Sequence, residues 1–180
     1  MKKYWYKTAM LVMALGVFTA CSDDDGPKIP EGPIALVNGA YVINTGNWNE
    51  NNGTIQWYDR DLKTVSADLF AAANGAGIGD AQDLCVYGTK IYITCSSSAK
   101  IEIVDRKDFK RIKTLNLTNE SGQPIQPRYM TAAKGNIYFT AYDGTVSQID
   151  TTSLSITKKI EVGGSHPEAL TSANGKLYIN

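Results

Sequence analysis

The side chains most often used in catalysis are scarce in this chain. His166 is the only histidine, so a Ser-His-Asp arrangement has a single candidate base, and no Gly-x-Ser-x-Gly elbow is present. A lone histidine without other ligands at metal-binding spacing is also a poor metal site. Asp80 and Asp83 are close in sequence, but aspartates before a strand more often cap turns or bind backbone amides. The sequence therefore predicts a non-enzymatic protein without a metal or cofactor.

Polar and aromatic side chains instead gather just before, or between, short apolar segments. Amides, aromatic rings and a few charges can form hydrogen bonds and stacking contacts with a large polar ligand. A polar rim that binds nothing would have the same composition, and this alternative stays open. The predicted ligand-binding residues are Asn47, Trp48, Asn49, Asp80, Gln82, Asp83, Gln126, Arg128, Tyr129, His166 and Glu168.

Two other sequence features are weaker candidates for a binding site. Trp57 and Tyr58 are neighbours on a predicted strand and point to opposite faces, so at least one is expected to pack in the core, which leaves Trp48 as the exposed stacking candidate. The glycine-rich segment 74–79 precedes a strand rather than a helix, so it is predicted to be a flexible connection and not a phosphate-binding loop.

Cys85 and Cys95 fall on the two strands of one predicted hairpin. A turn centred on Gly88 and Thr89 pairs Cys85 with Tyr92 and puts the two cysteines on different faces of the hairpin. A disulfide requires the two Cα atoms to lie within about 7 Å, so free, buried thiols are expected.

The elements that position these residues begin after an export signal. Residues 1–20 combine three lysines with an apolar stretch too short to span a bilayer, which indicates a secretory signal peptide. Residues 18–21 resemble the lipobox of bacterial lipoproteins, with Cys21 as the lipidated residue. Residues 21–33 continue with an acidic run and then Pro and Gly, which predicts a solvated tether.

The remaining residues, 34–180, contain a repeat. A glycine followed by a short aromatic-aliphatic strand recurs around Tyr41, Tyr92, Tyr138 and Tyr178, at intervals typical of propeller blades. A further strand is predicted eight residues before each of the last three tyrosines, and hydrophobicity alternates with period two throughout. Aspartates close the next strand of each of the first three units, and turn glycines lie at Gly88, Gly135 and Gly175.

This pattern predicts an all-β protein whose strands are ordered a, b, c, d within each blade, with no convincing helix. A β-sandwich is the alternative, but matched residues in successive units favour radial repetition. The sequence covers about three and a half blades, and a propeller cannot close in this way, so either it is a fragment or a truncated gene product, or the chain assembles with others. Because an open sheet edge is hazardous, a fragment or a truncated gene product is favoured.

Charge excludes one class of partner. The first 21 residues hold three lysines and no acid, which leaves 15 basic and 18 acidic residues in the rest of the chain. A mildly acidic domain lacks the basic footprint that nucleic acid requires.

A resemblance to a known family rests on residues 41–48 (YVINTGNW), 51–55 (NNGTI) and the Tyr58-Asp59 pair. These resemble the opening blade of the YncE-like β-propeller surface lipoproteins of Bacteroidetes, which include the BtuG-type cobalamin-binding lipoproteins. The resemblance covers residues 34–180 and implies a seven-bladed propeller that captures a corrinoid and passes it to a TonB-dependent outer-membrane transporter.

The same resemblance implies location and modification. The acidic run after Cys21 resembles an export tag of Bacteroidetes lipoproteins for the outer face of the outer membrane; periplasmic retention, with the run as a solvated tether, is the alternative. Residues 150–152 resemble an O-glycosylation sequon with Thr151 as acceptor. The alternative function is a propeller binding module for a glycan, peptide or protein partner at the cell surface. A propeller enzyme such as a lactonase would need a cluster of metal ligands.

Overall fold

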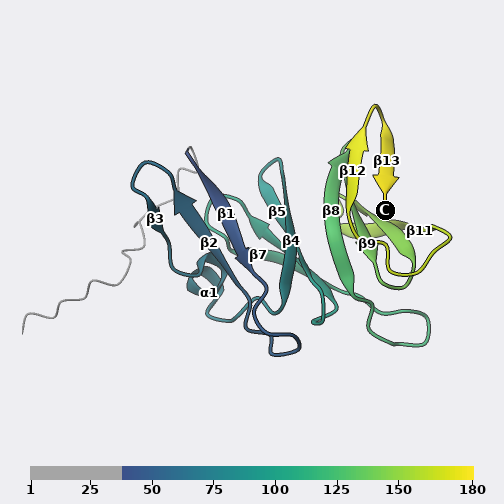
Figure 1. Cartoon of the computed structure of the whole chain (residues 1–180), viewed down its shortest axis with the longest axis horizontal. Coiled ribbons are helices and arrows are strands. Elements are labelled where there is room, and N and C mark those ends of the chain that lie inside the picture. Colours follow the sequence, from purple (N-terminus) through teal and green to yellow (C-terminus); the bar gives the residue numbers. More distant parts are fainter. Residues whose placement is uncertain (1–37) are drawn as a thin grey trace, which may run out of the picture.

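The structure is a computed structural model that describes residues 38–180. The predicted signal peptide, the lipidated Cys21 and the tether lie outside the described residues. The described part is all-β apart from one short helix, and its strands form four antiparallel sheets arranged as β-propeller blades (Figure 1).

Two blades have four strands, each a simple antiparallel meander. In both of them strand order along the chain equals strand order in the sheet, as the repeat predicts. Blade 2 comprises β4 (Ala81–Tyr87), β5 (Lys90–Cys95), β6 (Lys100–Asp105) and β7 (Arg111–Asn116). Blade 3 comprises β8 (Pro127–Ala133), β9 (Asn136–Ala141), β10 (Thr145–Asp150) and β11 (Ser155–Glu161).

Smaller sheets occupy the blade positions on either side. Blade 1 comprises β1 (Gly39–Asn44), β2 (Thr54–Asp59) and β3 (Thr64–Val65), which align with strands b, c and d. Blade 4 comprises β12 (Leu170–Ala173) and β13 (Lys176–Ile179), which align with strands a and b.

The turn chemistry matches the sequence prediction. Gly88, Gly135 and Gly175 have φ angles of 60°, 80° and 74°, a region that glycine enters at little cost. The Asp59 and Asp150 carboxylates accept hydrogen bonds from backbone N–H groups two and three residues ahead, which closes the c–d turns. The repeated aspartates therefore shape the turns rather than bind a ligand.

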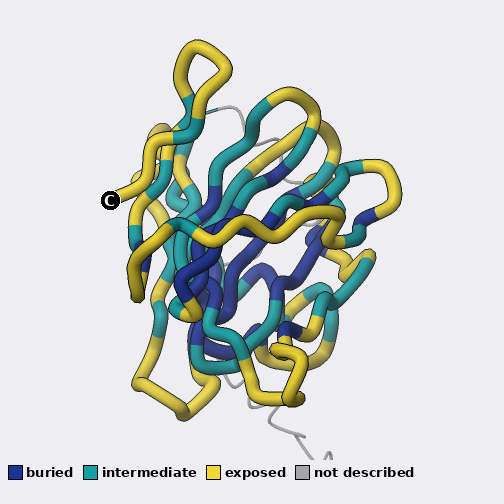
Figure 2. The backbone as a smooth tube through the Cα atoms, turned by 90° about the vertical axis from the view of Figure 1, so that its right-hand side faces the viewer, coloured by how far each residue is buried: buried dark blue, intermediate teal, exposed yellow. Residues whose placement is uncertain are grey.

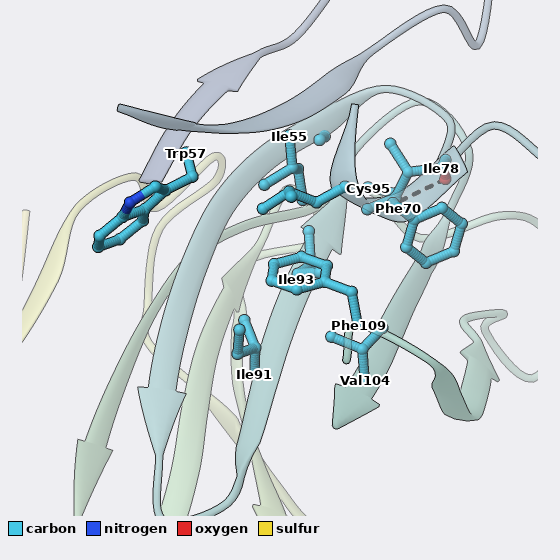
Figure 3. Close-up of a cluster of buried hydrophobic side chains, with 11 residues drawn as sticks. Ile55, Trp57, Phe70, Ile78, Ile91, Ile93, Cys95, Val104 and Phe109 are labelled. Atoms are coloured by element: carbon cyan, nitrogen blue, oxygen red, sulfur yellow. Dashed lines mark hydrogen bonds between the residues drawn. The ribbon is translucent and has the colours of Figure 1, made fainter. Parts of the chain in front are cut away.

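Apolar residues are buried between blades, where neighbouring sheets meet. The buried residues lie in the interior of the described part, and the exposed residues lie mainly in its outer loops and turns (Figure 2). One cluster lies between blades 1 and 2, where Ile55 and Trp57 of β2 face Ile91 and Ile93 of β5 (Figure 3). Tyr41 packs edge-on against Trp57 with ring centroids 5.2 Å apart, so the prediction that one of the paired aromatics is core holds for Trp57. A second cluster, which includes Tyr92, Ile101 and Phe139, joins blades 2 and 3.

The connection between blades 1 and 2 differs from the prediction, because it contains a helix and is packed. Helix α1 (Leu69–Asn74) begins at Asp68, whose carboxylate accepts a hydrogen bond from the Phe70 N–H, and ends at Gly75 in the left-handed region. Phe70 and Ile78 are fully buried in the first cluster. Six residues are too few for a helical period to show in the sequence.

Gly79, in the same connection, leaves no room for a side chain. Its φ is 101°, and a Cβ there would lie 2.4 Å from the Ser98 hydroxyl. The Gly79 carbonyl also accepts a hydrogen bond from the Gly53 N–H. The glycine-rich segment is therefore not simply a flexible connection: it lets two backbones approach closely.

The cysteine prediction is confirmed in its register. Cys85 pairs with Tyr92 across β4 and β5, and both described cysteines are free thiols. Cys95 is buried as expected, whereas Cys85 is only half-buried. Burial raises the pKa of Cys95 to about 12 and that of Cys85 to about 11, so both thiols stay protonated at neutral pH.

The meander divides each blade into two ends. The b–c loops and the blade-to-blade loops share one end, which we call the loop face, and the a–b and c–d turns share the other, which we call the turn face (Figure 1). Within residues 38–180, no helix has the length and apolar character needed to cross a membrane.

Candidate functional site

The candidate site is built from equivalent positions in three successive blades. Three apolar residues occupy equivalent positions in strands β4, β8 and β12: Leu84, Met130 and Leu170. Gln82, Arg128 and Glu168 each lie two residues before one of them. The first strands of neighbouring blades contact one another, so this position recurs along the inner edge of the blade array. The sequence alignment alone placed these three residues at one rim.

The structure joins the three side chains in one chain of hydrogen bonds. The Arg128 guanidinium donates from Nη1 to the Gln82 side-chain oxygen at 2.9 Å and from Nε to the Glu168 carboxylate at 3.0 Å. Nη1 also lies 3.3 Å from the buried Ser96 hydroxyl. Arg128 therefore connects three blades through its own side chain. These contacts orient its guanidinium, because its planar donors are engaged on two sides.

Aromatic rings complete this group. The Arg128 guanidinium lies over the Tyr142 ring, 4.7 Å from its centroid, and 5.8 Å from that of Tyr129. The Tyr142 hydroxyl donates to the second Glu168 oxygen, and the His166 ring packs on Tyr142 with centroids 4.7 Å apart. We call this group the rim cluster; its members are Gln82, Arg128, Tyr129, Tyr142, His166 and Glu168.

The backbone beneath the rim cluster is fixed by a repeated contact. The Thr94 hydroxyl of blade 2 donates to the Arg128 carbonyl, and the equivalent Thr140 hydroxyl of blade 3 donates to the Glu168 carbonyl, both at 2.6 Å. Both threonines are fully buried. Each blade thus holds the start of the next, which pre-organises the side chains above.

The electrostatics of the rim cluster are balanced. Burial opposes ionisation of Glu168, but hydrogen bonds from Tyr142 and Arg128 outweigh it and hold the pKa of Glu168 below its usual range. The hydrogen bond to Glu168 in turn raises the pKa of Tyr142. One cation and one anion compensate each other, which leaves polar and aromatic groups to meet a ligand.

A second group of predicted residues forms a separate loop. Asn47, Trp48 and Asn49 belong to residues 45–53, the b–c loop of blade 1, which we call the asparagine loop. Asp80 lies beneath it, fully buried, and its two carboxylate oxygens accept hydrogen bonds from the N–H groups of Asn49 and Asn51. Asp80 therefore supports the loop rather than offering its carboxylate to a ligand.

Three of the four asparagine side chains of the asparagine loop form hydrogen bonds with other side chains. Asn47 and Asn52 both donate to the Glu50 carboxylate, and Asn51 accepts from the Ser98 hydroxyl of blade 2. Trp48 is 54% exposed. The exposed indole is thus presented by a loop that its own polar groups hold in shape.

Two predicted residues have structural partners instead of exposed polar atoms. Asp83 accepts a hydrogen bond of 2.7 Å from the Met130 N–H of the next blade, and burial raises the pKa of Asp83. Gln126 is half-buried, and its carbonyl accepts from the Tyr142 N–H. Asp83 thus links strands β4 and β8, and the Gln126 backbone links two connections of blade 3.

Thr151, the predicted glycosylation site, lies at the opposite end of blade 3. It is in the c–d turn on the turn face, where its hydroxyl donates to the Gly135 carbonyl at 2.7 Å. This contact gives Thr151 a structural role in joining two turns, and its modification stays a prediction.

Sequence reasoning missed Tyr142 and Ser96. Both lie four residues after an aligned tyrosine and begin the b–c turns of blades 3 and 2, the same location as the asparagine loop of blade 1. The predicted ligand-binding residues include a b–c loop only in blade 1, and extending the prediction to the b–c loops of blades 2 and 3 would have included Ser96 and Tyr142.

A cavity of about 530 Å³ lies beside the rim cluster and not within it. It is lined by residues of the loop 162–169 and of β13, among them Ser165, Pro167 and Tyr178. The neighbours of His166 in the chain, Ser165 and Pro167, line this cavity, whereas His166 itself and the rest of the rim cluster do not. Within residues 38–180, no group of three or more His, Cys, Asp or Glu side chains is arranged to hold a metal ion.

Comparison with known proteins supports the fold and leaves the ligand open. A family model described as "Domain of unknown function (DUF5074)" matches residues 38–180. None of the curated protein sequences matches the chain. Among solved structures, the chain is similar to the dihydro-heme d1 dehydrogenase NirN in complex with DHE, with a TM-score of 0.58 and 12% identity over 79% of this chain.

It is also similar to the WD40 β-propeller domain of Doa1, with a TM-score of 0.54 and 17% identity over 76% of this chain. The chain spans 29% and 42% of the lengths of these two proteins. At such identities the similarity establishes the β-propeller fold alone. Since one of the two is a dehydrogenase, the fold does not decide whether a member is an enzyme.

Proposed function

Because the chain belongs to the family described as DUF5074, whose description names no activity, we propose that it is a binding protein whose loop face holds a polar ligand. The observation that carries this proposal is the rim cluster, in which Arg128, Glu168 and Gln82 from three blades meet beside stacked aromatic rings. A rigid, charge-balanced group of hydrogen-bonding and aromatic side chains suits recognition more than catalysis.

The ligand that fits this chemistry and the family resemblance is a corrinoid such as cobalamin. A corrin ring is rimmed with amide side chains, which pair with carboxylate, guanidinium and hydroxyl groups like those of Glu168, Arg128 and Tyr142. In this proposal the protein is anchored to the outer membrane through Cys21, is displayed at the cell surface, and delivers the ligand to a TonB-dependent transporter.

A second candidate is supported by Trp48. An indole that is 54% exposed on a fixed loop can stack on the apolar face of a sugar ring, so a surface glycan is the alternative ligand. A peptide or protein partner would use the same loop face. These alternatives share the binding function and differ in which group of residues a substitution would disable.

The test is a titration of cyanocobalamin into the mature lipoprotein, purified from membranes in detergent and followed by heat and tryptophan fluorescence. We expect saturable binding that Arg128→Ala weakens by about tenfold or more, since a charge-assisted hydrogen bond in such a site contributes about 1.5–3 kcal/mol.

Arg111→Ala is the matched control, because Arg111 is also paired with a glutamate and placed over an aromatic ring, but lies in blade 2 outside the rim cluster. Circular dichroism verifies that both variants are folded. Absence of cyanocobalamin binding by the folded wild-type protein, together with glycan binding that Trp48→Ala abolishes, would replace the corrinoid with the glycan.

A further inference from the structure

The two faces of the molecule carry opposite charge. The six connections of the loop face, residues 45–53, 66–80, 96–99, 117–126, 142–144 and 162–169, contain six carboxylate residues and no lysine or arginine. These acids are Glu50, Asp68, Asp80, Glu120, Asp143 and Glu168. Arg128, Lys100 and Lys159, the cations next to this face, pair with Glu168, Glu102 and Asp143.

The turn face has the reverse composition. Its turns, at residues 60–63, 88–89, 106–110, 134–135, 151–154 and 174–175, contain six basic and two acidic residues. The basic residues are all exposed and belong to blades 1, 2 and 3: Arg60, Lys63, Arg106, Lys107, Lys110 and Lys134. Strand ends add Lys90 and Lys176, and they add Asp59, Asp105 and Asp150, whose carboxylates accept backbone hydrogen bonds from the turns.

The chain enters the folded part at this basic face. Gly39, the first residue of β1, pairs with Asp59 at the start of a c–d turn, and the Asn38 carbonyl accepts a hydrogen bond from the Arg60 N–H. Residues 1–37, with the predicted lipid anchor at Cys21, therefore connect to the molecule at the turn face and not at the rim cluster.

The length of the connecting segment does not by itself fix the orientation. The 16 residues between Cys21 and Asn38 have a maximum span of about 55 Å, which would let either face approach a membrane. Charge distinguishes the faces, because lysine and arginine are attracted to anionic lipid phosphates and carboxylates are repelled by them.

We infer that the turn face is a docking surface for the phosphate-bearing lipid surface to which the protein is anchored, so that the rim cluster and the asparagine loop point away from it. The inference rests on the lipid anchoring of the proposed function. It adds an orientation for ligand capture: basic turns from three successive blades lie against anionic headgroups, and the ligand-binding face is open to the medium. Delivery to the transporter then requires the molecule to turn on its connecting segment, whose span allows either face to approach the membrane.

The test measures which lysines the membrane covers. The mature lipoprotein is inserted into vesicles of phosphatidylcholine, with or without phosphatidylglycerol, and labelled with a membrane-impermeant amine reagent whose rate at each lysine is read by mass spectrometry. Lys63, Lys107, Lys134 and Lys176 are expected to react several-fold more slowly on the anionic vesicles. Lys113 and Lys158, on the outer strands, report the unshielded rate.

A matched pair of variants separates location from net charge. Lys107→Glu with Lys176→Glu should abolish the protection of Lys63 and Lys134, whereas Lys113→Glu with Lys158→Glu changes the charge equally and should preserve it. Protection should also disappear at 1 M salt, where the screening length falls to about 3 Å. The same mass spectra report whether Thr151 carries a glycan. A glycan at Thr151 would keep the turn face away from the membrane, so this residue must be unmodified in the protein used.

Equal labelling rates on the two kinds of vesicle would overturn the orientation, as would protection of Trp48 from iodide quenching instead of protection of the turn lysines. Cyanocobalamin titration of the same vesicles is an independent readout. Loss of corrinoid binding with intact lysine protection would refute only the ligand, and the reverse result would refute only the orientation.

Discussion

Glu102 and Glu168 are both paired with an arginine and a hydroxyl, yet their surroundings differ. Glu102 is completely buried, and its partners Lys100, Arg111 and Thr114 all belong to blade 2. The side chain of Glu168 is 36% exposed, and its partners Arg128 and Tyr142 come from the neighbouring blade. The Glu102 group thus lies within one blade and is buried, whereas the Glu168 group joins two blades and is partly exposed to solvent.

The difference separates a structural ion cluster from a binding one. Burial alone would raise the pKa of Glu102, but hydrogen bonds from Lys100, Thr114 and Arg111 outweigh it and lower that pKa. A carboxylate so completely satisfied has no capacity left for a ligand. Glu168 is only partly enclosed, so a ligand can exchange for water around it at little cost.

The largest expected effect breaks the buried cluster. Glu102→Ala removes a buried acceptor shared by Lys100, Arg111 and Thr114, and a hydrogen bond to a charged group contributes about 1.5–3 kcal/mol. Because the Lys100 and Arg111 side chains are partly exposed and can be hydrated, we expect a cost of about 3 kcal/mol in the free energy of unfolding. Glu168→Ala should cost about 0–1 kcal/mol, because that pair is partly exposed. Urea unfolding of both variants measures the contrast, and equal costs would contradict it.

Acid should affect both groups at once. The pKa values of Glu102 and Glu168 are lowered in the folded protein, so the stabilisation is present above the unfolded pKa of about 4.3 and is lost as pH falls through the folded values. Asp83 acts in the opposite sense, because its raised pKa makes its ionised form unfavourable to folding.

We therefore expect the free energy of unfolding to fall as the pH is lowered from neutral to below the pKa of an ordinary glutamate, about 4.3. A Glu102→Gln variant should show a smaller pH dependence in the same denaturant titrations. A Glu102→Gln variant with the same pH dependence as the wild type would contradict the lowered pKa of Glu102.

Asp80 offers a third kind of carboxylate, buried but held by backbone N–H groups alone. Asp80→Ala removes the acceptor for Asn49 and Asn51, and an unsatisfied buried donor costs about 1–3 kcal/mol. The asparagine loop should then loosen, which acrylamide quenching of Trp48 would detect. Because Trp57 is buried, a Trp57-only variant lacking Trp48 corrects for its signal.

The smallest effect compares the two hydroxyl donors. Thr114→Val should cost about 1 kcal/mol, since it removes one hydrogen bond to the buried Glu102 carboxylate while the same oxygen still accepts from Arg111. Tyr142→Phe should cost about 1 kcal/mol or less in stability, because water can replace the hydroxyl at partly exposed Glu168, but it should weaken ligand binding. Thermal melts and the cyanocobalamin titration measure the two responses.

Much of the blade architecture was predictable because local sequence patterns determine it. Period-two alternation, the turn glycines and the Asp59, Asp105 and Asp150 series each act within a few residues, so the sequence alone predicts blade order and the Cys85–Tyr92 register. Helix α1 was not predictable, because its formation depends on burying Phe70 between two blades rather than on a helical period.

The candidate site was predictable as a set of positions but not as a set of contacts. Alignment of the blades determined from sequence alone that Gln82, Arg128 and Glu168 occupy equivalent places, as the positions of a repeat must. Only the tertiary structure decided that Arg128 bonds to both Gln82 and Glu168 and that Tyr142 bonds to Glu168. It also decided that the Asp80 carboxylate binds backbone N–H groups of the asparagine loop. The physical reason is that these hydrogen bonds join residues 26 to 46 positions apart, at distances set by how neighbouring blades pack.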